Sequence, residues 1–229
     1  MKTVAVVPIK ATSERVENKN FRHFADDRSL FELLTEKLAN CPLIDEVYVS
    51  TDENTVQEYV ISQGCKFLSR DSQYCNNQIA WSEVITHVVS SLPVDDDTTV
   101  MWCHTTSPLF DRYMEAIEVY MEAARTGQND GLVTVSRLSE FIVNDMKRPV
   151  NYAWGIWHPY SQNLEKLYRI TGALFIAKKG DMIRNNYVIS QNPLFFETTA
   201  YESIDVDTEF DFTMAQLMYE NKRKFFTST

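Results

Sequence analysis

The sequence has no long apolar run, no closely paired cysteines and no excess of positive charge. No stretch approaches the ~18 apolar residues of a membrane-spanning helix, and residues 1–8 form a strand pattern without the parts of a secretory signal. The four cysteines include no C-x-x-C pair, so neither a zinc site nor a disulfide framework is indicated. The net charge of −10 disfavours general binding to nucleic acid or anionic membranes. We expect a cytoplasmic protein that binds neither nucleic acid nor a membrane.

Strand-like and helix-like segments alternate along a chain of 229 residues, which is long enough for one domain. The expected strands cover residues 4–8, 46–50, 66–68, 98–104, 131–136, 172–177 and 194–199. The expected helices cover residues 29–40, 51–64, 80–92, 111–126, 181–185 and 209–223. This alternation predicts an α/β domain with three layers (α/β/α) and a mostly parallel sheet.

A cationic segment follows the first strand directly. Its polar side chains have no helical period, and they are Lys10, Thr12, Ser13, Arg15 and Lys19. Because ligands bind at the carboxyl ends of parallel strands, this combination of cations and hydroxyls suits a phosphate chain. An ordinary exposed polar loop explains the composition equally well.

A second polar cluster lies near the end of the chain, where Asp205 and Asp207 are two residues apart. In an extended segment such residues point to the same side, so both carboxylates can reach one hard cation, and Mg²⁺ is the natural candidate. The alternative is that acidic residues stabilise the amino end of the following helix. We expect Glu209 and Asp211 to have only that capping role.

Residues 137–166 interrupt the regular alternation. The stretch is too long for an ordinary connection, and it is too aromatic for a disordered linker because it contains Phe141, Tyr152, Trp154, Trp157 and Tyr160. These side chains cover either the chain's own core or a protein interface.

The first loop resembles the amino-terminal motif of the CMP-sugar synthetases, the cytidylyltransferases that activate sialic acids and related acidic sugars. The family pattern is roughly I-P-A-R-G-G-S-K-R-x-x-x-K-N, and this chain matches it at Pro8, Ser13, Arg15, Lys19 and Asn20. Lys10 replaces the family's arginine, Ala11 and Thr12 replace two glycines, and Glu14 replaces a lysine. The missing glycines remove conformations that let backbone approach phosphate closely.

The resemblance extends along the chain with the motifs in the same order. Asp205 and Asp207 align with the two metal-binding aspartates of the family's S-I-D-I-D-T-E-x-D-F. Residues 104–109 align with Q-P-T-S-P-L, the segment that seats the acceptor sugar, with His104 in place of glutamine. A histidine at a strand end is as readily a structural residue as a ligand, although His104 could serve as a general base if it reached the acceptor hydroxyl.

Softer matches are Asp52 in Ser-Thr-Asp, Ser82, and Thr171-Gly172 where the family has Asn-Gly. Gln162 survives from a family motif, R-R-Q-x-L-P, whose two arginines are absent here. In sialic acid synthetases an arginine of this segment is associated with the acidic sugar, so its loss puts a sialic acid acceptor in doubt.

The resemblance implies a nucleotide-diphospho-sugar transferase (Rossmann-like) fold and Mg²⁺-dependent transfer of CMP from CTP, with release of pyrophosphate. The implied acceptor is a small anion: a sugar acid, a sugar phosphate or a phosphonate. The implied catalytic residues are Arg15, Lys19 and Asp207, and the implied metal ligands are Asp205 and Asp207. The implied nucleotide-binding residues are Lys10, Thr12, Ser13, Arg15, Lys19, Asp52 and Ser82. The implied acceptor-binding residues are His104, Thr105, Thr106, Ser107, Gln162, Thr171 and Gly172.

The family commonly dimerises through an extension in the region of residues 137–166. The resemblance therefore implies a homodimer in which this stretch approaches the acceptor pocket of the other subunit. Two other functions stay open. A metal-dependent glycosyltransferase also uses a D-x-D pair, and a non-catalytic relative would explain the departures from the family pattern.

Overall fold

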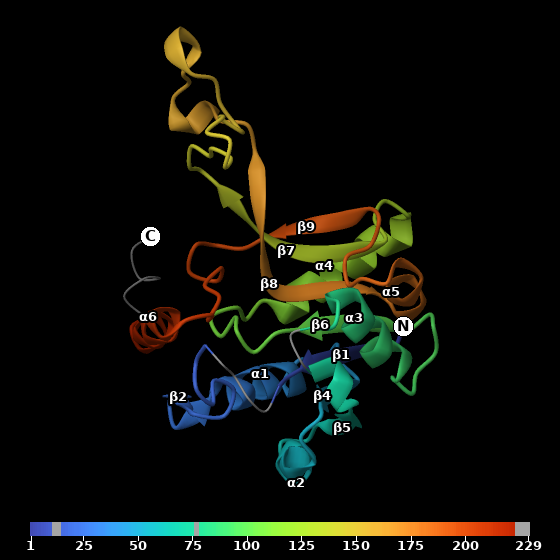
Figure 1. The fold of residues 1–229 in the computed structure, drawn as a ribbon. Coiled ribbons are helices and arrows are strands. Elements are labelled where there is room, and N and C mark those ends of the chain that lie inside the picture. Colours follow the sequence, from blue (N-terminus) through green and yellow to red (C-terminus); the bar gives the residue numbers. More distant parts are fainter. Residues whose placement is uncertain (11–14, 76–77, 223–229) are drawn as a thin grey trace.

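The computed structural model describes residues 1–10, 15–75 and 78–222. Among these residues, seven strands form one central sheet, with helices on both of its faces (Figure 1). The strands are β1 (Thr3–Pro8), β4 (Glu46–Thr51), β5 (Lys66–Ser69), β6 (Thr99–Cys103), β7 (Gly131–Leu138), β8 (Leu167–Lys178) and β9 (Pro193–Glu197). A separate hairpin pairs β2 (His23–Ala25) with β3 (Arg28–Ser29).

Helices cover both faces of the sheet. They are α1 (Leu30–Ala39), α2 (Gln57–Ser62), α3 (Trp81–Ser90), α4 (Tyr113–Thr126), α5 (Lys179–Asn185) and α6 (Glu209–Glu220), which packs outside the others. Short 3₁₀ turns are η1 (Asn54–Val56), η2 (Ser72–Cys75), η3 (Gly155–Trp157) and η4 (Ser161–Asn163). Apolar residues of α1, α2 and α4 pack on one face of the sheet and those of α3 and α5 on the other, which confirms the expected three-layer fold.

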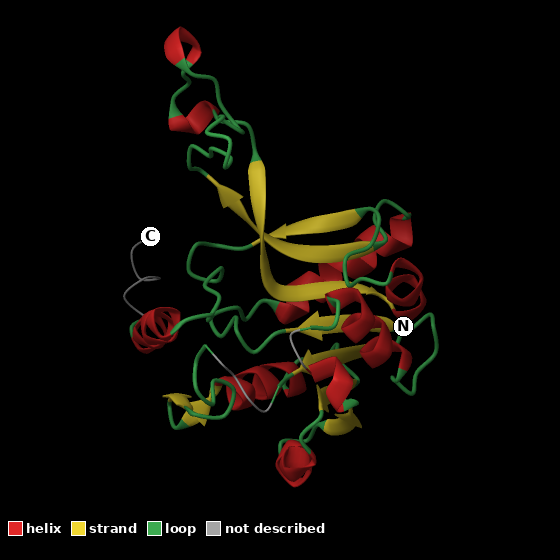
Figure 2. Ribbon diagram, in the orientation of Figure 1, coloured by secondary structure: helices red, strands yellow, loops and turns green. Residues whose placement is uncertain are grey.

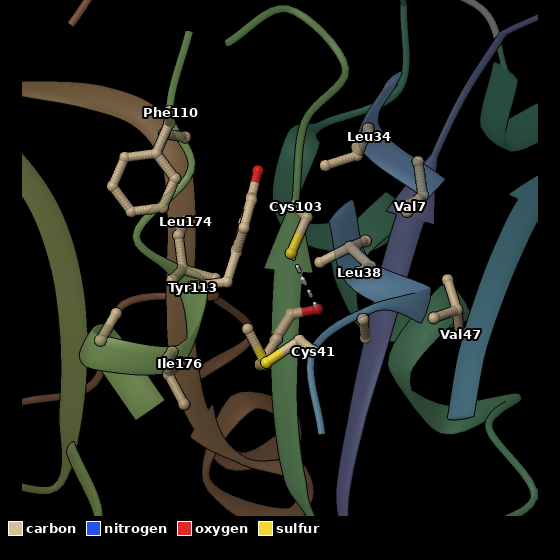
Figure 3. Packing of buried hydrophobic residues seen from close by; sticks show 14 of the residues in the cluster. Val7, Leu34, Leu38, Cys41, Val47, Cys103, Phe110, Tyr113, Leu174 and Ile176 are labelled. Carbon is tan, nitrogen blue, oxygen red and sulfur yellow. Dashed lines mark hydrogen bonds between the residues drawn. The ribbon is translucent and has the colours of Figure 1, made fainter. Parts of the chain in front are cut away.

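The core forms because central strands carry apolar side chains on both faces. In β1, Val4 and Val6 face α3 while Ala5 and Val7 face α1. Figure 3 shows the second of these faces, where Cys103 lies between side chains of α1 and Tyr113 at the start of α4. All four cysteines are free, as their spacing indicates.

Local signals in the sequence account for where the helices begin. Ser29 caps α1, where its hydroxyl accepts from the backbone of Glu32 while the Glu32 side chain accepts from the backbone of Ser29. Thr208 and Asp211 form the same capping box at the start of α6. Helix α6 packs against α1 and the β2–β3 hairpin through Phe212 and Ala215.

The strand order is β5-β4-β1-β6-β8-β7-β9, and β8 runs antiparallel to both of its neighbours. The other pairings are parallel, so the carboxyl ends of β1, β4 and β6 lie at one edge of the sheet. Three loops that carry the predicted functional residues therefore meet at this edge.

Residues 139–166 form an arm that projects away from the sheet between β7 and β8 (Figure 1). It consists mainly of loops and short helical turns (Figure 2). The pairing of β7 with β8 reaches Leu138 and Leu167 at its base. Within the described ranges, no helix has both the length and the apolar character needed to span a membrane.

Candidate active site

Three segments are tied together at the carboxyl edge of the sheet: the loop after β1, the turn after β6 and the segment before α6. The Val206 N–H donates to the carbonyl of Thr106 over 2.8 Å. Lys19 Nζ donates to the carbonyl of Val206 over 2.8 Å. Thr105 Oγ1 donates to Asn20 Oδ1 over 2.7 Å, which joins the turn after β6 to the first loop. The predicted phosphate and metal segments are therefore neighbours.

The cations of the first loop lie against the acidic segment. Arg15 Nη2 is 2.8 Å from Asp207 Oδ1, and Lys19 Nζ is 4.0 Å from the same oxygen. Burial lowers the pKa of Lys19, an effect that the charge of Asp207 opposes. The carbonyl of Lys10 accepts from Asn20 Nδ2 over 3.1 Å, which fixes the backbone where the loop begins. Thr12 and Ser13 lie outside the described residues.

The two aspartates differ in environment. Asp205 is half-buried, and its Oδ1 is buried without a hydrogen-bond partner among the described residues. Burial chiefly raises the pKa of Asp205, and the neighbouring charge of Asp207 adds to this effect while a hydrogen bond from Thr106 opposes it. The side chain of Asp207 is 44% exposed.

A buried carboxylate oxygen without a partner, beside a second and accessible carboxylate, fits a hard divalent cation. The described ranges contain no cluster of three or more His, Cys, Asp or Glu side chains arranged to hold a metal. Asp205 and Asp207 could each supply a carboxylate ligand. This suits Mg²⁺, which is commonly held by one or two carboxylates together with substrate phosphates.

The neighbouring acidic residues have other partners. Asp211 Oδ2 accepts from the Thr208 N–H over 2.8 Å and from the Asp207 N–H over 3.3 Å. Asp211 thereby caps α6, as predicted, and fixes the backbone at Asp207. Both carboxylate oxygens of Glu209 bind Arg22, at 2.9 and 2.6 Å, so Glu209 has an ion pair in addition to its place in the first turn of α6.

His104 is held on both sides of its ring. Trp102 Nε1 donates to His104 Nε2 over 2.8 Å, and the ring also hydrogen-bonds to the backbone of Gly172. Burial lowers the pKa of His104 to about 4, so the ring is neutral at pH 7. Because both of its polar contacts are taken, His104 is placed to shape the site and not to accept a proton. These contacts do not support the role of general base that His104 would have had if its ring reached the acceptor hydroxyl.

Four other residues of the predicted acceptor site, Thr106, Ser107, Thr171 and Gly172, lie in the segments next to this histidine. Thr106 bonds both to Asp205 and to Val206, and Ser107 Oγ is buried with no partner among the described residues. Thr171 is buried and donates to the carbonyl of Thr134 over 3.3 Å, so its hydroxyl proton is committed. Gly172 has a φ of +77°, a conformation that favours glycine.

Asp52 and Ser82 lie on neighbouring elements. Asp52 follows β4 and hydrogen-bonds to the thiol of Cys75. Ser82 is in the first turn of α3. This end of α3 lies near the site, since the ring of Trp81 is 6.0 Å from that of His104. The sequence motifs did not indicate that Arg70 lies near the site. It is buried, and it donates to Cys75 Sγ and to the Ile9 carbonyl just before the first loop.

Gln162 is separated from these residues. It is exposed in η4, within the arm, whereas the other described residues of the predicted site lie at the edge of the sheet (Figure 1). Within one chain, the structure does not bring Gln162 to the predicted acceptor site.

Comparison with known families agrees with this arrangement. A family model described as cytidylyltransferase matches residues 4–226. The chain belongs to the cytidylyltransferase family. Its match covers the cationic loop, the turn after β6 and the aspartate pair together, and it confirms the resemblance to CMP-sugar synthetases.

The relatives are distant in sequence. An N-acylneuraminate cytidylyltransferase from Escherichia coli O18:K1:H7 is 23% identical over 97% of this chain, which spans 53% of that protein. A CMP-N,N′-diacetyllegionaminic acid synthase from Legionella pneumophila is 27% identical, and the alignment covers 96% of this chain and 97% of the relative. The solved structure of CMP:2-keto-3-deoxy-manno-octonic acid synthetase complexed with CTP aligns with a TM-score of 0.67 at 14% identity, covering 97% of this chain and all of that one. This likeness confirms the expected nucleotide-diphospho-sugar transferase fold.

Proposed function

We propose that this cytidylyltransferase uses Mg²⁺ and CTP to transfer CMP to an acidic sugar, with release of pyrophosphate. The observation that carries the proposal is the contact between the cationic loop and the aspartate pair. Arg15 and Lys19 reach Asp207 across the hydrogen-bonded junction of Thr106 and Val206. Cations that can hold phosphates thus lie beside carboxylates that can hold a metal.

The reaction makes one bond and breaks one. An acceptor oxygen attacks the α-phosphorus of CTP in line, the bond from that phosphorus to the β-phosphate oxygen breaks, and the acceptor proton is released. Such a transfer depends mainly on positioning and on stabilising charge. Arg15, Lys10 and Lys19 would hold the triphosphate, while the turn after β6 would orient the acceptor. Because His104 is neutral and fully bonded, it positions this turn and takes no proton.

Asp205 and Asp207 would hold Mg²⁺. The metal, when bound, would neutralise charge that develops on the phosphates. Asp205 contributes a carboxylate oxygen that no described residue satisfies. Asp207 is kept beside it by the capping of α6, where Asp211 holds the Asp207 backbone. The helix cap thus contributes to the metal site without touching the ion.

Two observations bear on the class of acceptor: the names of the relatives, and one difference between this sequence and the family pattern. The relatives' names contain N-acylneuraminate and diacetyllegionaminic acid, which are both acidic sugars. Residues 160–165 of this chain read Tyr-Ser-Gln-Asn-Leu-Glu, without the two arginines of the family motif, and in sialic acid synthetases an arginine of this segment is associated with the acidic sugar. We therefore propose an acidic sugar other than the common sialic acid as the acceptor.

The arm supports a homodimer. Trp154, Trp157 and Tyr160 are 56%, 76% and 76% exposed, so they do not cover the chain's own core. Phe141 packs on Tyr152 and His158, which gives the arm a small aromatic cluster of its own. Aromatic side chains are enriched in protein interfaces, and a second copy of the chain would cover those that project outward. Gln162 would then approach the acceptor site of the partner subunit.

A screen for pyrophosphate release tests the proposed activity. CTP, UTP, ATP and GTP are each incubated with Mg²⁺ and a panel of sugar acids, sugar phosphates and phosphonates. We expect release with CTP and at least one sugar acid, and a CMP-sugar product. Nucleotide binding without turnover for any acceptor would indicate a non-catalytic relative. Transfer of the sugar from an added nucleotide sugar, with release of the nucleotide, would indicate a glycosyltransferase.

A further inference from the structure

Lys37 directs its charge into the protein. It lies near the carboxyl end of α1, three residues before the C-cap residue Asn40. Its Nζ donates to the carbonyls of Pro108 and Phe110 over 2.5 and 2.8 Å. A lysine that bonds to two backbone carbonyls fixes a turn, and here the turn is the one that follows β6.

This turn is the junction of the candidate active site. Thr105 at its start bonds to Asn20 of the first loop. Thr106 holds Val206 through its carbonyl and Asp205 through its side chain. Lys37 anchors the opposite end of the same turn. A displacement of the turn would therefore move the acceptor side and the metal side of the site together.

We propose that Lys37 is a positioning residue for the transfer reaction, holding residues 105–110 in the geometry that Asp205 and the acceptor require. The inference rests on the proposed function. Among the described residues, the hydrogen bonds of Lys37 reach neither the predicted metal ligands nor the predicted nucleotide-binding residues, and Lys37 acts through the backbone of the turn. Misplacement of a reacting group by about 1 Å commonly costs up to ~100-fold in rate.

The state of Lys37 gives the proposal a pH signature. Burial lowers the pKa of Lys37 to about 8. The charged groups that face it are Asp111, Lys222, Arg28 and Glu36, of which Asp111 and Glu36 favour the protonated amine and the two cations oppose it. Charge-assisted hydrogen bonds are roughly twice as strong as neutral ones. The hydrogen bonds from Lys37 to the turn are therefore strongest well below pH 8 and weaken as the pH rises through 8.

Folding stability is expected to respond in the opposite sense. The pKa of Lys37 is lower in the folded protein than its ordinary value of 10.5. Between pH 8 and 10.5 the unfolded chain binds the extra proton, so the contribution of Lys37 to stability rises with pH. A loss of turnover above pH 8 without a loss of stability thus separates a positioning role from a structural one.

Lys179 offers a matched control. It is a buried lysine, whereas Lys37 is half-buried, and its Nζ likewise donates to two carbonyls, those of Leu92 and Val94, over 3.1 and 2.7 Å. Its backbone bonds to Thr98, just before β6 begins, so it lies at the opposite edge of the sheet. Lys179→Met removes the same kind of contact away from the site.

The test compares Lys37→Met, Lys37→Arg and Lys179→Met with the wild type in pyrophosphate release from CTP with the acceptor found by the screen. We expect kcat/KM for the acceptor to fall roughly tenfold to a hundredfold in Lys37→Met and to stay near the wild-type value in Lys179→Met. The fall in wild-type activity above pH 8 should vanish in Lys37→Met. It should also vanish in Lys37→Arg, which keeps its charge and restores activity at pH 7.

Two outcomes would overturn the positioning role while leaving the proposed function intact. One is a folded Lys37→Met variant with wild-type kcat and KM, and the other is an equal loss in Lys179→Met. If Lys37→Met does not fold, a Lys37→Arg variant whose activity falls above pH 8 as in the wild type would also overturn the positioning role. A wild type that releases no pyrophosphate with any acceptor would overturn the proposed function itself.

Discussion

Asp207 and Arg15 form an ion pair that joins the two halves of the candidate site. Their side chains are 44% and 69% exposed, and exposed ion pairs commonly contribute about 1 kcal/mol or less. A metal–nucleotide complex can therefore separate them at small cost. Once separated, Arg15 is free to meet a phosphate and Asp207 a cation. The pair keeps both side chains at the edge of the sheet where we propose that CTP and the metal bind.

His104 gives a residue-scale prediction that does not depend on turnover. Its pKa in the folded protein, about 4, is below its ordinary value of 6.5. Between these values the unfolded chain binds more protons, so stability falls as the pH drops from 6.5 towards 4. We expect His104 to account for a loss of about 2 kcal/mol between pH 7 and pH 5.

Urea unfolding at pH 7 and pH 5 measures this effect. The His104→Gln variant carries the residue that the family has at this position and cannot titrate. It should lose about 2 kcal/mol less than the wild type between the two pH values. Equal losses in both proteins would show that the ring is not held neutral by its surroundings.

At the scale of elements, the site depends on how loops and helix ends are joined. The amino end of α6 is fixed by Thr208 and Asp211, and the same capping box holds the backbone of Asp207. Lys19 and Thr106 then fix Val206 from two sides. The aspartate pair is thus placed by backbone contacts on both flanks, which explains how a short extended segment can present carboxylates in a defined way.

The alternation of elements was predictable from the sequence because apolar period and capping residues are local signals. Ser29 and Glu32 predicted where α1 begins, and the structure confirms their capping box. The direction of β8 was not predictable, since the apolar pattern of a strand is the same in both directions. Its length was underestimated because residues 167–170 pair with β7 at the base of the arm, where side chains are less buried.

The candidate site was predicted from two local patterns. Lys19 belongs to the cationic segment that follows the first strand, and Asp205 and Asp207 were predicted from their spacing ahead of a helix. The structure places these three residues close together. Lys37 and Arg70 were not found, because each acts on a backbone carbonyl distant in sequence. Such contacts leave no pattern in the residues that accept them. Gln162 was assigned by resemblance alone, and in a single chain it lies on the arm.

At the scale of the whole molecule, the arm predicts how two chains assemble. Light scattering should give about twice the chain mass of 26.6 kDa for the wild type. A Trp154→Ser, Trp157→Ser double variant should be monomeric and should lose activity, because the interface and the partner's contribution to the acceptor site would be lost together. Ile61→Ser, which changes a residue 55% exposed on α2, is the control and should stay dimeric. An active wild-type monomer would contradict this assembly.

We propose that Asp205 and Asp207 bind the metal that accompanies CTP at this edge of the sheet. Calorimetric titration of CTP, with Mg²⁺ and with a chelator, into the wild type, Asp205→Asn and Asp207→Asn tests this. We expect Mg²⁺ to strengthen CTP binding to the wild type at least about tenfold, or roughly 1.4 kcal/mol. Both variants should lose most of this gain and their turnover, yet keep metal-free CTP binding and the fold. The same gain with Mg²⁺ in all three proteins would contradict the claim.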